Sequence, residues 1–149
     1  MTAVFRAARH ADVPAIVAML ADDFLGAGRE EAEIDDAYWA AFDAIDADPR
    51  NRLIVAEADG QIVGTLQLTL LPGLSRHGML RAQIEAVRVA APVRGQGLGR
   101  AMLGWAIGEA RRAGCGMVQL TSNKRREDAI RFYKSLGFES SSEGLKLPL

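Results

Sequence analysis

A glycine-rich turn at residues 93–100 constrains this chain more than any other segment. Its sequence is Val-Arg-Gly-Gln-Gly-Leu-Gly-Arg, with an apolar, strand-like pattern before it and a helical pattern after it. Glycine permits close approach of a ligand because it has no Cβ, and it also permits positive φ angles. The free N–H groups and the positive dipole end of a following helix favour a bound anion. The turn therefore predicts a phosphate or pyrophosphate site at the start of a helix.

The spacing of this turn differs from two nucleotide-binding motifs. A P-loop needs a Lys-Ser/Thr pair after its last glycine, whereas Arg100 and Ala101 follow Gly99. A dinucleotide-binding turn needs a third glycine where Arg100 stands and an acidic residue at the end of the next strand. That strand is expected to end in Leu-Thr-Ser at 120–122. The spacing thus argues against both motifs, and a connection that binds no ligand is the remaining alternative.

Composition limits the class of protein. A chain of 149 residues, 49% hydrophobic and 25% charged, is expected to form one globular domain over residues 1–149. A net charge of −1 argues against nucleic acid or an anionic membrane as a partner. One cysteine and two histidines argue against a disulfide framework and a metal site. Neither a signal peptide nor a membrane-spanning stretch is recognisable, so the expected location is the cytoplasm.

Hydrophobic periodicity and turn residues predict a mixed α/β order of elements. Strands are expected at 3–8, 52–58, 61–71, 81–89 and 117–122, and as a closing hairpin of 138–142 with 145–149. Helices are expected from residue 12 to a break at 26–28, from 31 to 47, from the glycine turn to 113, and from 127 to 136. Asp59-Gly60 is a two-residue hairpin signal, and 72–78 is expected to be a loop. The strand at 117–122 is short and apolar, which favours a central place in the sheet.

Three segments resemble the GNAT superfamily of N-acetyltransferases. In the turn, Arg94-x-x-Gly97-x-Gly99 fits the pattern [RQ]-x-x-G-x-[GA] of an acyl-CoA pyrophosphate loop. Residues 84–89 (Ile-Glu-Ala-Val-Arg-Val) resemble the family's central strand, and 129–138 resemble its closing A-x-x-F-Y-x-x-x-G-F helix and strand. These segments occur in family order and spacing over residues 80–140. The resemblance implies a GNAT-type fold, with a central twisted mixed sheet of six to seven strands flanked by about four helices.

The resemblance also implies acetyl-CoA as cosubstrate and assigns residues to it, with no metal. Backbone N–H groups of the turn would hold the pyrophosphate. The pantetheine arm would enter between two parted strands and pair with the backbone of Val87 and Val89, and an N–H near Val87 would polarise the thioester carbonyl. Core packing is the alternative use of these valines, and the two uses are compatible. The residues assigned to the cofactor are Val87, Val89, Arg94, Gly95, Gln96, Gly97, Leu98, Gly99, Arg100, Asn123 and Arg126.

Asn123 and Arg126 carry alternatives of their own. Asn123 follows a predicted strand, where family members often place an Asn or a backbone group against pantetheine, and it could instead only end that strand. The chain departs from the family's N-x-x-A step, because Arg126-x-x-Ala129 stands in its place. Arg126 could reach a CoA phosphate or be solvated.

Tyr133 is the candidate general acid. It occupies the position of the family's tyrosine, where its hydroxyl would face the cofactor sulfur. A tyrosine phenol has an ordinary pKa of about 10, so it stays protonated at neutral pH and can donate to a thiolate leaving group. A core aromatic beside Phe132 and Phe138 is the alternative.

Glu85 is the candidate general base, acting through water. On a regular strand it shares a face with Val87 and Val89, which places a carboxylate near the acyl site. The alternative is a salt bridge from Glu85 to Arg81 or Arg88.

The resulting prediction is an acetyl-CoA-dependent N-acetyltransferase that acetylates a primary amine by direct attack in a ternary complex. A non-catalytic acyl-CoA-binding or regulatory module on the same fold is the alternative. Cys115 is not expected to carry the acetyl group, because a helix C-terminus raises a thiol pKa. The first two helices, the connection between them at 26–31 and the loop at 72–81 are expected to shape the acceptor pocket. The sequence leaves open whether the amine belongs to a small molecule or a peptide, and whether the protein is a homodimer.

Overall fold

The computed structural model describes residues 2–22 and 33–149. The predicted helix break at 26–28, the predicted helix start at residue 31 and the 26–31 connection assigned to the acceptor pocket lie outside the described residues. Contacts within the chain define two compact units, Met1–Gln119 and Leu120–Leu149, and each is described by itself. One domain over residues 1–149 stays a prediction.

The first unit has a mixed α/β order, as predicted. Its elements are β1 (Val4–Ala7), the 3-10 helix η1 (His10–Asp12), α1 (Val13–Ala21), α2 (Asp36–Ala47), β2 (Asn51–Ala58), β3 (Gln61–Leu71), α3 (Ser75–Gly78), β4 (Arg81–Val89), the 3-10 helix η3 (Ala91–Val93), α4 (Leu98–Arg112) and β5 (Met117–Leu120), whose last residue opens the second unit. In the described part of the chain, the helices of nine or more residues are α1, α2, α4 and the α5 helix (Glu127–Ser135) of the second unit. This agrees with the prediction of about four helices.

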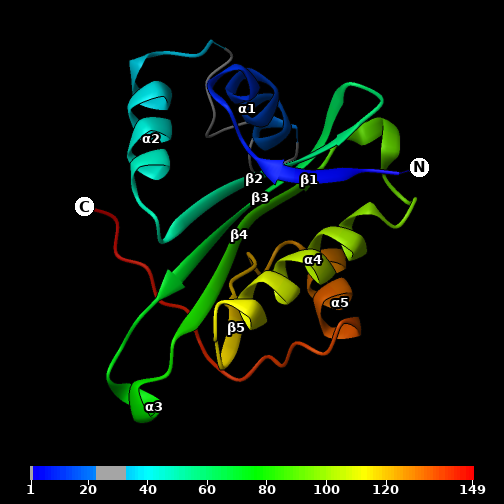
Figure 1. The fold of residues 1–149 in the computed structure, drawn as a ribbon. Helices are drawn as coiled ribbons and strands as arrows, with labels where there is room; N and C mark the ends of the chain where they lie inside the picture. The colour runs from blue at the N-terminus through cyan, green and yellow to red at the C-terminus, as the bar shows by residue number, and fades with distance from the viewer. Residues whose placement is uncertain (1, 23–32) are drawn as a thin grey trace. The chain divides into compact units, whose positions relative to one another are not determined.

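The described residues form one five-stranded sheet in the order β1-β2-β3-β4-β5 (Figure 1). Strands β1 to β4 pair antiparallel in succession. The sheet has fewer strands than the predicted six to seven, and β5 lies at its end, so the predicted central place of β5 is wrong. The predicted closing hairpin is also wrong, because residues 138–149 form neither helix nor strand. Three serines and two glutamates at 139–143 leave this segment few side chains to bury.

Different helices cover the two faces of the sheet. On one face, Val55 packs against α1 and α2 in a buried cluster that includes Val13 and Phe42. On the other face, Gly64 lies against α4, since a Cβ at Gly64 would come within 2.6 Å of the sulfur of Met102. Figure 1 shows α1 and α2 on one side of the sheet and α4 on the other. We call these the α1/α2 face and the α4 face.

Local residue chemistry sets the ends of α2 and α4. The α2 helix begins at Asp36, later than predicted, because the side chain of Asp35 caps it by accepting the N–H of Ala37 at 3.0 Å. The α4 helix follows Gly97 at its N-cap, and Gly114, at φ 87°, turns the chain just past its end. The buried stripe of α4 recurs every three to four residues and comprises Leu98, Met102, Leu103, Ala106 and Ala110.

Both β-hairpins of the sheet turn through positive φ angles. Asp59 (φ 52°) and Gly60 (φ 74°) form the predicted two-residue connection between β2 and β3. The predicted loop between β3 and β4 contains the short α3 turn, in which Arg76 (φ 56°) and His77 (φ 60°) adopt left-handed conformations. Neither residue is a glycine, so this tip stores backbone strain.

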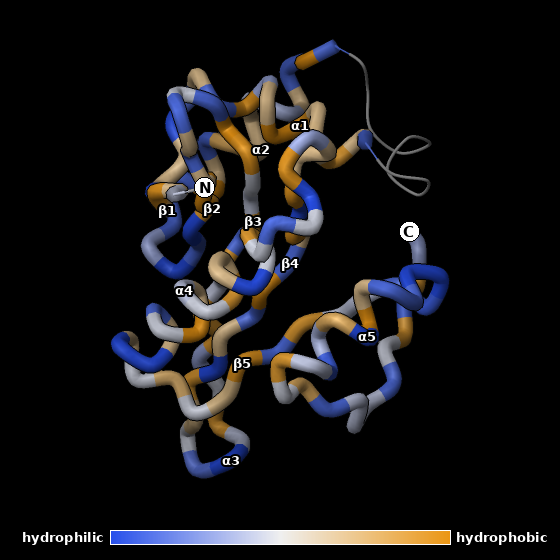
Figure 2. Tube along the Cα trace, turned by 90° about the vertical axis from the view of Figure 1, so that its right-hand side faces the viewer, coloured by the Kyte–Doolittle hydropathy of each residue, from blue (hydrophilic) through white to orange (hydrophobic). Residues whose placement is uncertain are grey.

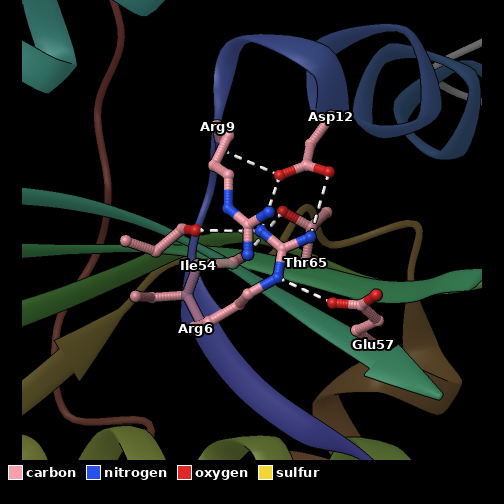
Figure 3. A network of polar contacts seen from close by, with 7 residues as sticks. Arg6, Arg9, Asp12, Ile54, Glu57 and Thr65 are labelled. Carbon is pink, nitrogen blue, oxygen red and sulfur yellow. Dashed lines mark hydrogen bonds and ion pairs between the residues drawn. The ribbon is translucent and has the colours of Figure 1, made fainter. Parts of the chain in front are cut away.

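A partly buried ion-pair cluster ties β1 to the start of α1. Figure 3 shows the guanidinium of Arg6 between the carboxylates of Asp12 and Glu57. Arg6 donates to both oxygens of Asp12, at 2.8 and 3.2 Å, and to Glu57 at 2.8 Å. Asp12 also accepts the backbone N–H of Arg9 at 2.8 Å. The hydrogen bonds from Arg6 are the main reason that the pKa of Asp12 is held below its ordinary value.

The second unit contains α5, which ends as predicted. Leu136 is its C-cap and Gly137, at φ 100°, follows. Hydrophobic and hydrophilic residues alternate along α5 (Figure 2), the pattern of a helix with one apolar face.

Candidate active site

The glycine turn leaves the start of α4 open to a ligand. Gly95 (φ 80°) and Gly97 (φ 83°) both adopt left-handed conformations, and a Cβ on either would meet nothing within 4 Å. No side chain caps the helix. The first backbone hydrogen bond of α4 runs from the N–H of Ala101 to the carbonyl of Gly97, at 3.1 Å. The N–H groups of residues 98–100 therefore precede the first intrahelical bond, and they can hold an anion.

Leu98 anchors this open turn. Its side chain is buried, whereas Gln96 and Arg100 on either side are exposed. A pocket beside the turn is lined by residues from the start of the chain and the start of α4: Thr2, Ala3, Phe5, Gln96, Gly97, Leu98 and Ala101.

The side chain of Arg94 points back to the protein. Its Nε donates to the carbonyl of Val89 at 3.1 Å, and its Nη2 lies 3.4 Å from both the carbonyl and the carboxylate of Asp22, the C-cap of α1. The first residue of the turn motif therefore joins the turn to the end of β4 and to α1. The sequence carried no sign of the contact with Asp22, which is 72 residues away.

A β-bulge at Ala86 changes the faces of β4. Ala86 has a φ of 53°, and the register against β3 shifts there: Glu85 pairs with Gln67, but Arg88 pairs with Thr65. Residues that pair across antiparallel strands point to the same face. Glu85 and Arg88 therefore share the face of Gln67 and Thr65, which is the α1/α2 face. The expectation of a regular strand was wrong.

Val87 and Val89 lie on the α4 face, opposite to Glu85. Val89 pairs with Gly64, whose missing Cβ would point at α4. The prediction that Glu85 shares a face with these two valines is therefore wrong. The bulge has no sequence signal, because the residue with the positive φ is an alanine rather than a glycine.

Two arginines bond to the carbonyls of the valines assigned to pantetheine. Arg88 donates from Nη1 to the carbonyl of Val87 at 2.9 Å, and Arg94 donates from Nε to the carbonyl of Val89 at 3.1 Å. A ligand that pairs with either carbonyl must share it with a guanidinium or displace that group.

Hydrogen bonds join the β5 segment to the first residues of β4. The N–H of Gly116 donates to the carbonyl of Leu80 at 2.9 Å, and Gln119 bonds through its side chain to Arg81 and Gln83. The Glu85–Val89 half of β4 lies beyond these contacts. This is the half to which the sequence assigned the pantetheine arm.

Glu85 itself is exposed and points to the α1/α2 face. In the described part of the chain its carboxylate forms no ion pair, so the alternative of a salt bridge to Arg81 or Arg88 is not found. An exposed carboxylate can take up a proton from an amine through water.

The second unit holds the other assigned residues. Tyr133 is half-buried in α5, with its ring centroid 5.4 Å from that of Phe132 and 5.9 Å from that of Phe138. It thus has the aromatic neighbours expected of a packing residue. Asn123 accepts the N–H of Arg125 at 2.9 Å, which is a local turn contact, and Arg126 is the N-cap of α5.

Cys115 has the environment of an unreactive thiol. It lies just after Gly114, which has a positive φ, and burial raises the pKa of its thiol. Over residues 2–22 and 33–149, no group of three or more His, Cys, Asp or Glu side chains could hold a metal ion. In the same ranges no helix has the length and hydropathy to cross a membrane.

Comparison with known proteins identifies the family. Residues 13–138 match the acetyltransferase (GNAT) family, and the chain belongs to this family. It is similar to an aminoalkylphosphonate N-acetyltransferase of Salmonella typhimurium, with 36% identity over 110 residues, 73% of this chain and 71% of that protein.

Two further similarities extend the comparison. The chain is 36% identical to a glucosamine 6-phosphate N-acetyltransferase of Trypanosoma brucei brucei over 90 residues, 60% of this chain and 59% of that protein. The crystal structure of a transcriptional regulator from Bacillus halodurans C-125 has a TM-score of 0.96 and 45% sequence identity, over 99% of this chain and 100% of that one.

Proposed function

We propose that this protein transfers an acetyl group from acetyl-CoA to a primary amine by direct attack in a ternary complex. The observation that carries the proposal is the open start of α4, where Gly95 and Gly97 have positive φ angles and no side chain caps the helix. This geometry suits the pyrophosphate of a CoA thioester, and the family match supplies the reaction class.

The cosubstrate would be held mainly by backbone groups. N–H groups of residues 95–100 would bind the pyrophosphate, with Arg94 positioning the turn through Val89 and Asp22. The N–H near Val87 would polarise the thioester carbonyl, and the side chains of Asn123 and Arg126 would contact pantetheine or a phosphate. These assignments rest on the motif positions, with the turn geometry in support.

Two side chains would move the protons. The amine nitrogen forms a bond to the thioester carbon, and the C–S bond breaks. Glu85 would take the proton of the amine through water, and Tyr133 would give its phenolic proton to the departing sulfur. The free carboxylate of Glu85 supports the first role, because no ion pair competes for it in the described part of the chain.

The names of two relatives support a first choice of acceptor class. The aminoalkylphosphonate and glucosamine 6-phosphate N-acetyltransferases are named for acceptors that join an amine to a phosphorus oxyanion. Small amines of this kind are the first acceptors to test, before peptide amines. We also propose that residues 1–149 act as one catalytic domain.

A second candidate is a regulatory module that binds acyl-CoA without turnover. The observation in its favour is the 45% identity to a structure described as a transcriptional regulator. Both functions use the same CoA site, so CoA binding alone does not separate them.

Calorimetry and a thiol-release assay separate the two candidates. We expect acetyl-CoA to bind with a Kd of roughly 1–100 µM, and at least one amine of a panel to release CoA. The panel contains 2-aminoethylphosphonate, glucosamine 6-phosphate, glucosamine, spermidine and a lysine peptide. Binding without turnover across the panel would favour the regulatory module. Absence of acetyl-CoA binding would overturn both candidates.

A further inference from the structure

Polar side chains cross the sheet in a row beside Glu85. The register pairs Asn51 of β2 with Thr69 of β3, and Thr69 with Gln83 of β4, so these side chains point to one face. Gln67, two residues before Thr69, points to the same face. Gln119 of β5 joins the row through its side chain. We call the set Asn51, Gln67, Thr69, Gln83 and Gln119 the polar row.

Hydrogen bonds between side chains hold the polar row together. Asn51 accepts from Thr69 at 2.6 Å and from Gln67 at 3.1 Å. Gln119 donates to Gln83 at 3.1 Å and accepts from Arg81 at 3.0 Å. The bonds cross from β2 to β3 and from β4 to β5. All five members of the row are partly buried, so their amide and hydroxyl groups are held in defined orientations rather than being free in solvent.

The same strands are apolar on their other face. Ile54, Leu66, Leu68, Ala82 and Ile84 are each at most 1% exposed there. On the α1/α2 face, the part of the sheet around Val55 is also apolar, because α1 and α2 cover it. The polar row begins where this apolar cluster ends. A solvated sheet face explains single polar residues, but it does not require an interlinked set.

The polar row leaves hydrogen-bonding groups free next to Glu85. Gln67 pairs directly with Glu85 across the strands, and Gln83 lies two residues before Glu85 on the same face. These spacings place the Cα atoms of Gln67 and Gln83 roughly 5–7 Å from the Cα atom of Glu85. Among the described residues, the side-chain carbonyl of Gln67 and the side-chain NH2 group of Gln83 form no hydrogen bond.

We propose that Gln67 and Gln83 bind the amine acceptor and determine its chemical class. An amine placed at Glu85 would have two neutral amides within reach of its oxygen substituents, and the positive charge of Arg81 at the far side of Gln83. The class that fits is an amine whose skeleton carries hydroxyl or phosphorus oxyanion groups, rather than an aliphatic polyamine. This inference rests on the proposed acetyl transfer and adds the acceptor site to it.

The test uses Gln67→Leu and Gln83→Leu, which keep the side-chain size and remove the amide. With glucosamine 6-phosphate or 2-aminoethylphosphonate as acceptor, each variant is expected to raise the acceptor KM at least tenfold. The Kd of acetyl-CoA should stay within twofold of wild type. Gln61→Leu is the control, since Gln61 lies on the same strand as Gln67 but about 20 Å along it and, beyond a register shift in β3, on the α4 face, and the KM of this variant should not change.

A second measurement does not depend on turnover. Side-chain amide signals of the wild-type protein, assigned by NMR from the leucine variants, are followed while the acceptor is added to the CoA-bound protein. The signals of Gln67 and Gln83 should shift, and that of Gln61 should not. Turnover with unchanged KM in both variants would overturn the inference but leave the proposed function intact. Absence of turnover would overturn the proposed function, and unmoved amide signals would then overturn the acceptor site as well.

Discussion

Glu85 and Val89 lie on opposite faces of β4, although they are four positions apart and a regular strand would place them on one face. The bulge at Ala86 is the cause. It directs the carboxylate of Glu85 to the polar row on the α1/α2 face, while the side chain of Val89 packs toward α4. The proposed base and the proposed pantetheine strand therefore use different sides of the same backbone.

Ala86 offers a test of the bulge. An L-residue in the left-handed region pays about 1–2 kcal/mol, and glycine avoids this cost but loses about 0.5–1 kcal/mol of chain entropy. Ala86→Gly should therefore raise the free energy of unfolding by about 0–1.5 kcal/mol and retain acetyl transfer. Ala86→Val should lower both the free energy of unfolding and the rate of acetyl transfer, because a β-branched residue fits a positive φ poorly. Urea denaturation and turnover check this, and a valine variant that matches wild type would contradict the bulge.

Gly97 offers a test of the CoA turn. Gly97→Ala meets no neighbouring atom but strains a backbone at φ 83°, so we expect a stability loss of about 1–2 kcal/mol and weaker acetyl-CoA binding in calorimetry. Gly104→Ala is the control, since Gly104 is exposed within α4 and its Cβ would also meet nothing. It should raise stability by up to about 1 kcal/mol without changing the Kd. Equal affinities in the two variants would argue against the turn as the CoA site.

Tyr133→Phe separates catalysis from packing. The ring keeps its neighbours Phe132 and Phe138 and loses only its hydroxyl. If that hydroxyl protonates the thiolate, kcat should fall by about 10²-fold or more, with the Kd of acetyl-CoA near that of wild type. Phe132→Leu serves as a packing control, and it should lower the free energy of unfolding without lowering kcat. An unchanged kcat in Tyr133→Phe would remove Tyr133 from the mechanism.

Asp12 is expected to make stability depend on acid pH. Because Arg6 holds the folded-state pKa of Asp12 below its ordinary value, the stabilisation is present above the unfolded pKa of about 4 and is lost as the pH falls through the folded pKa. Asp12→Asn should cost about 2–3 kcal/mol at neutral pH and flatten this acid dependence. Asp22→Asn, whose ion pair with Arg94 is more than half exposed, should cost less than about 1 kcal/mol. Urea denaturation from pH 3 to 7 measures both.

Cys115 should take no part in acetyl transfer. Burial raises the pKa of its thiol, so little thiolate is present at neutral pH, and alkylation by iodoacetamide at pH 7.5 should be slower than for free cysteine. Cys115→Ala should keep turnover within about twofold, since no step of a ternary-complex mechanism passes through a thiol. An acetylated Cys115 peptide in mass spectrometry of the working enzyme would contradict this prediction.

The C-terminal part of the chain shows where local patterns stop being informative. The end of α5 follows from Gly137, which has a φ of 100°, and the sequence predicted it. The alternation Leu-Lys-Leu-Pro-Leu at 145–149 also predicted a strand, but a strand forms only when a partner strand pairs with it. The described residues provide no such pairing for 138–149, so pattern alone gave a wrong result there.

The amino-acid sequence by itself determined the features that depend on a few consecutive residues. The glycine turn, the Asp59-Gly60 hairpin and the buried stripe of α4 follow from the φ angles that glycine permits and from the 3.6-residue helical period. Only the tertiary structure decided the face of Glu85 and the composition of the polar row. Alanine carries no signal for the positive φ at Ala86, and partners such as Gln83 and Gln119, 36 residues apart, meet only because the sheet brings their strands together.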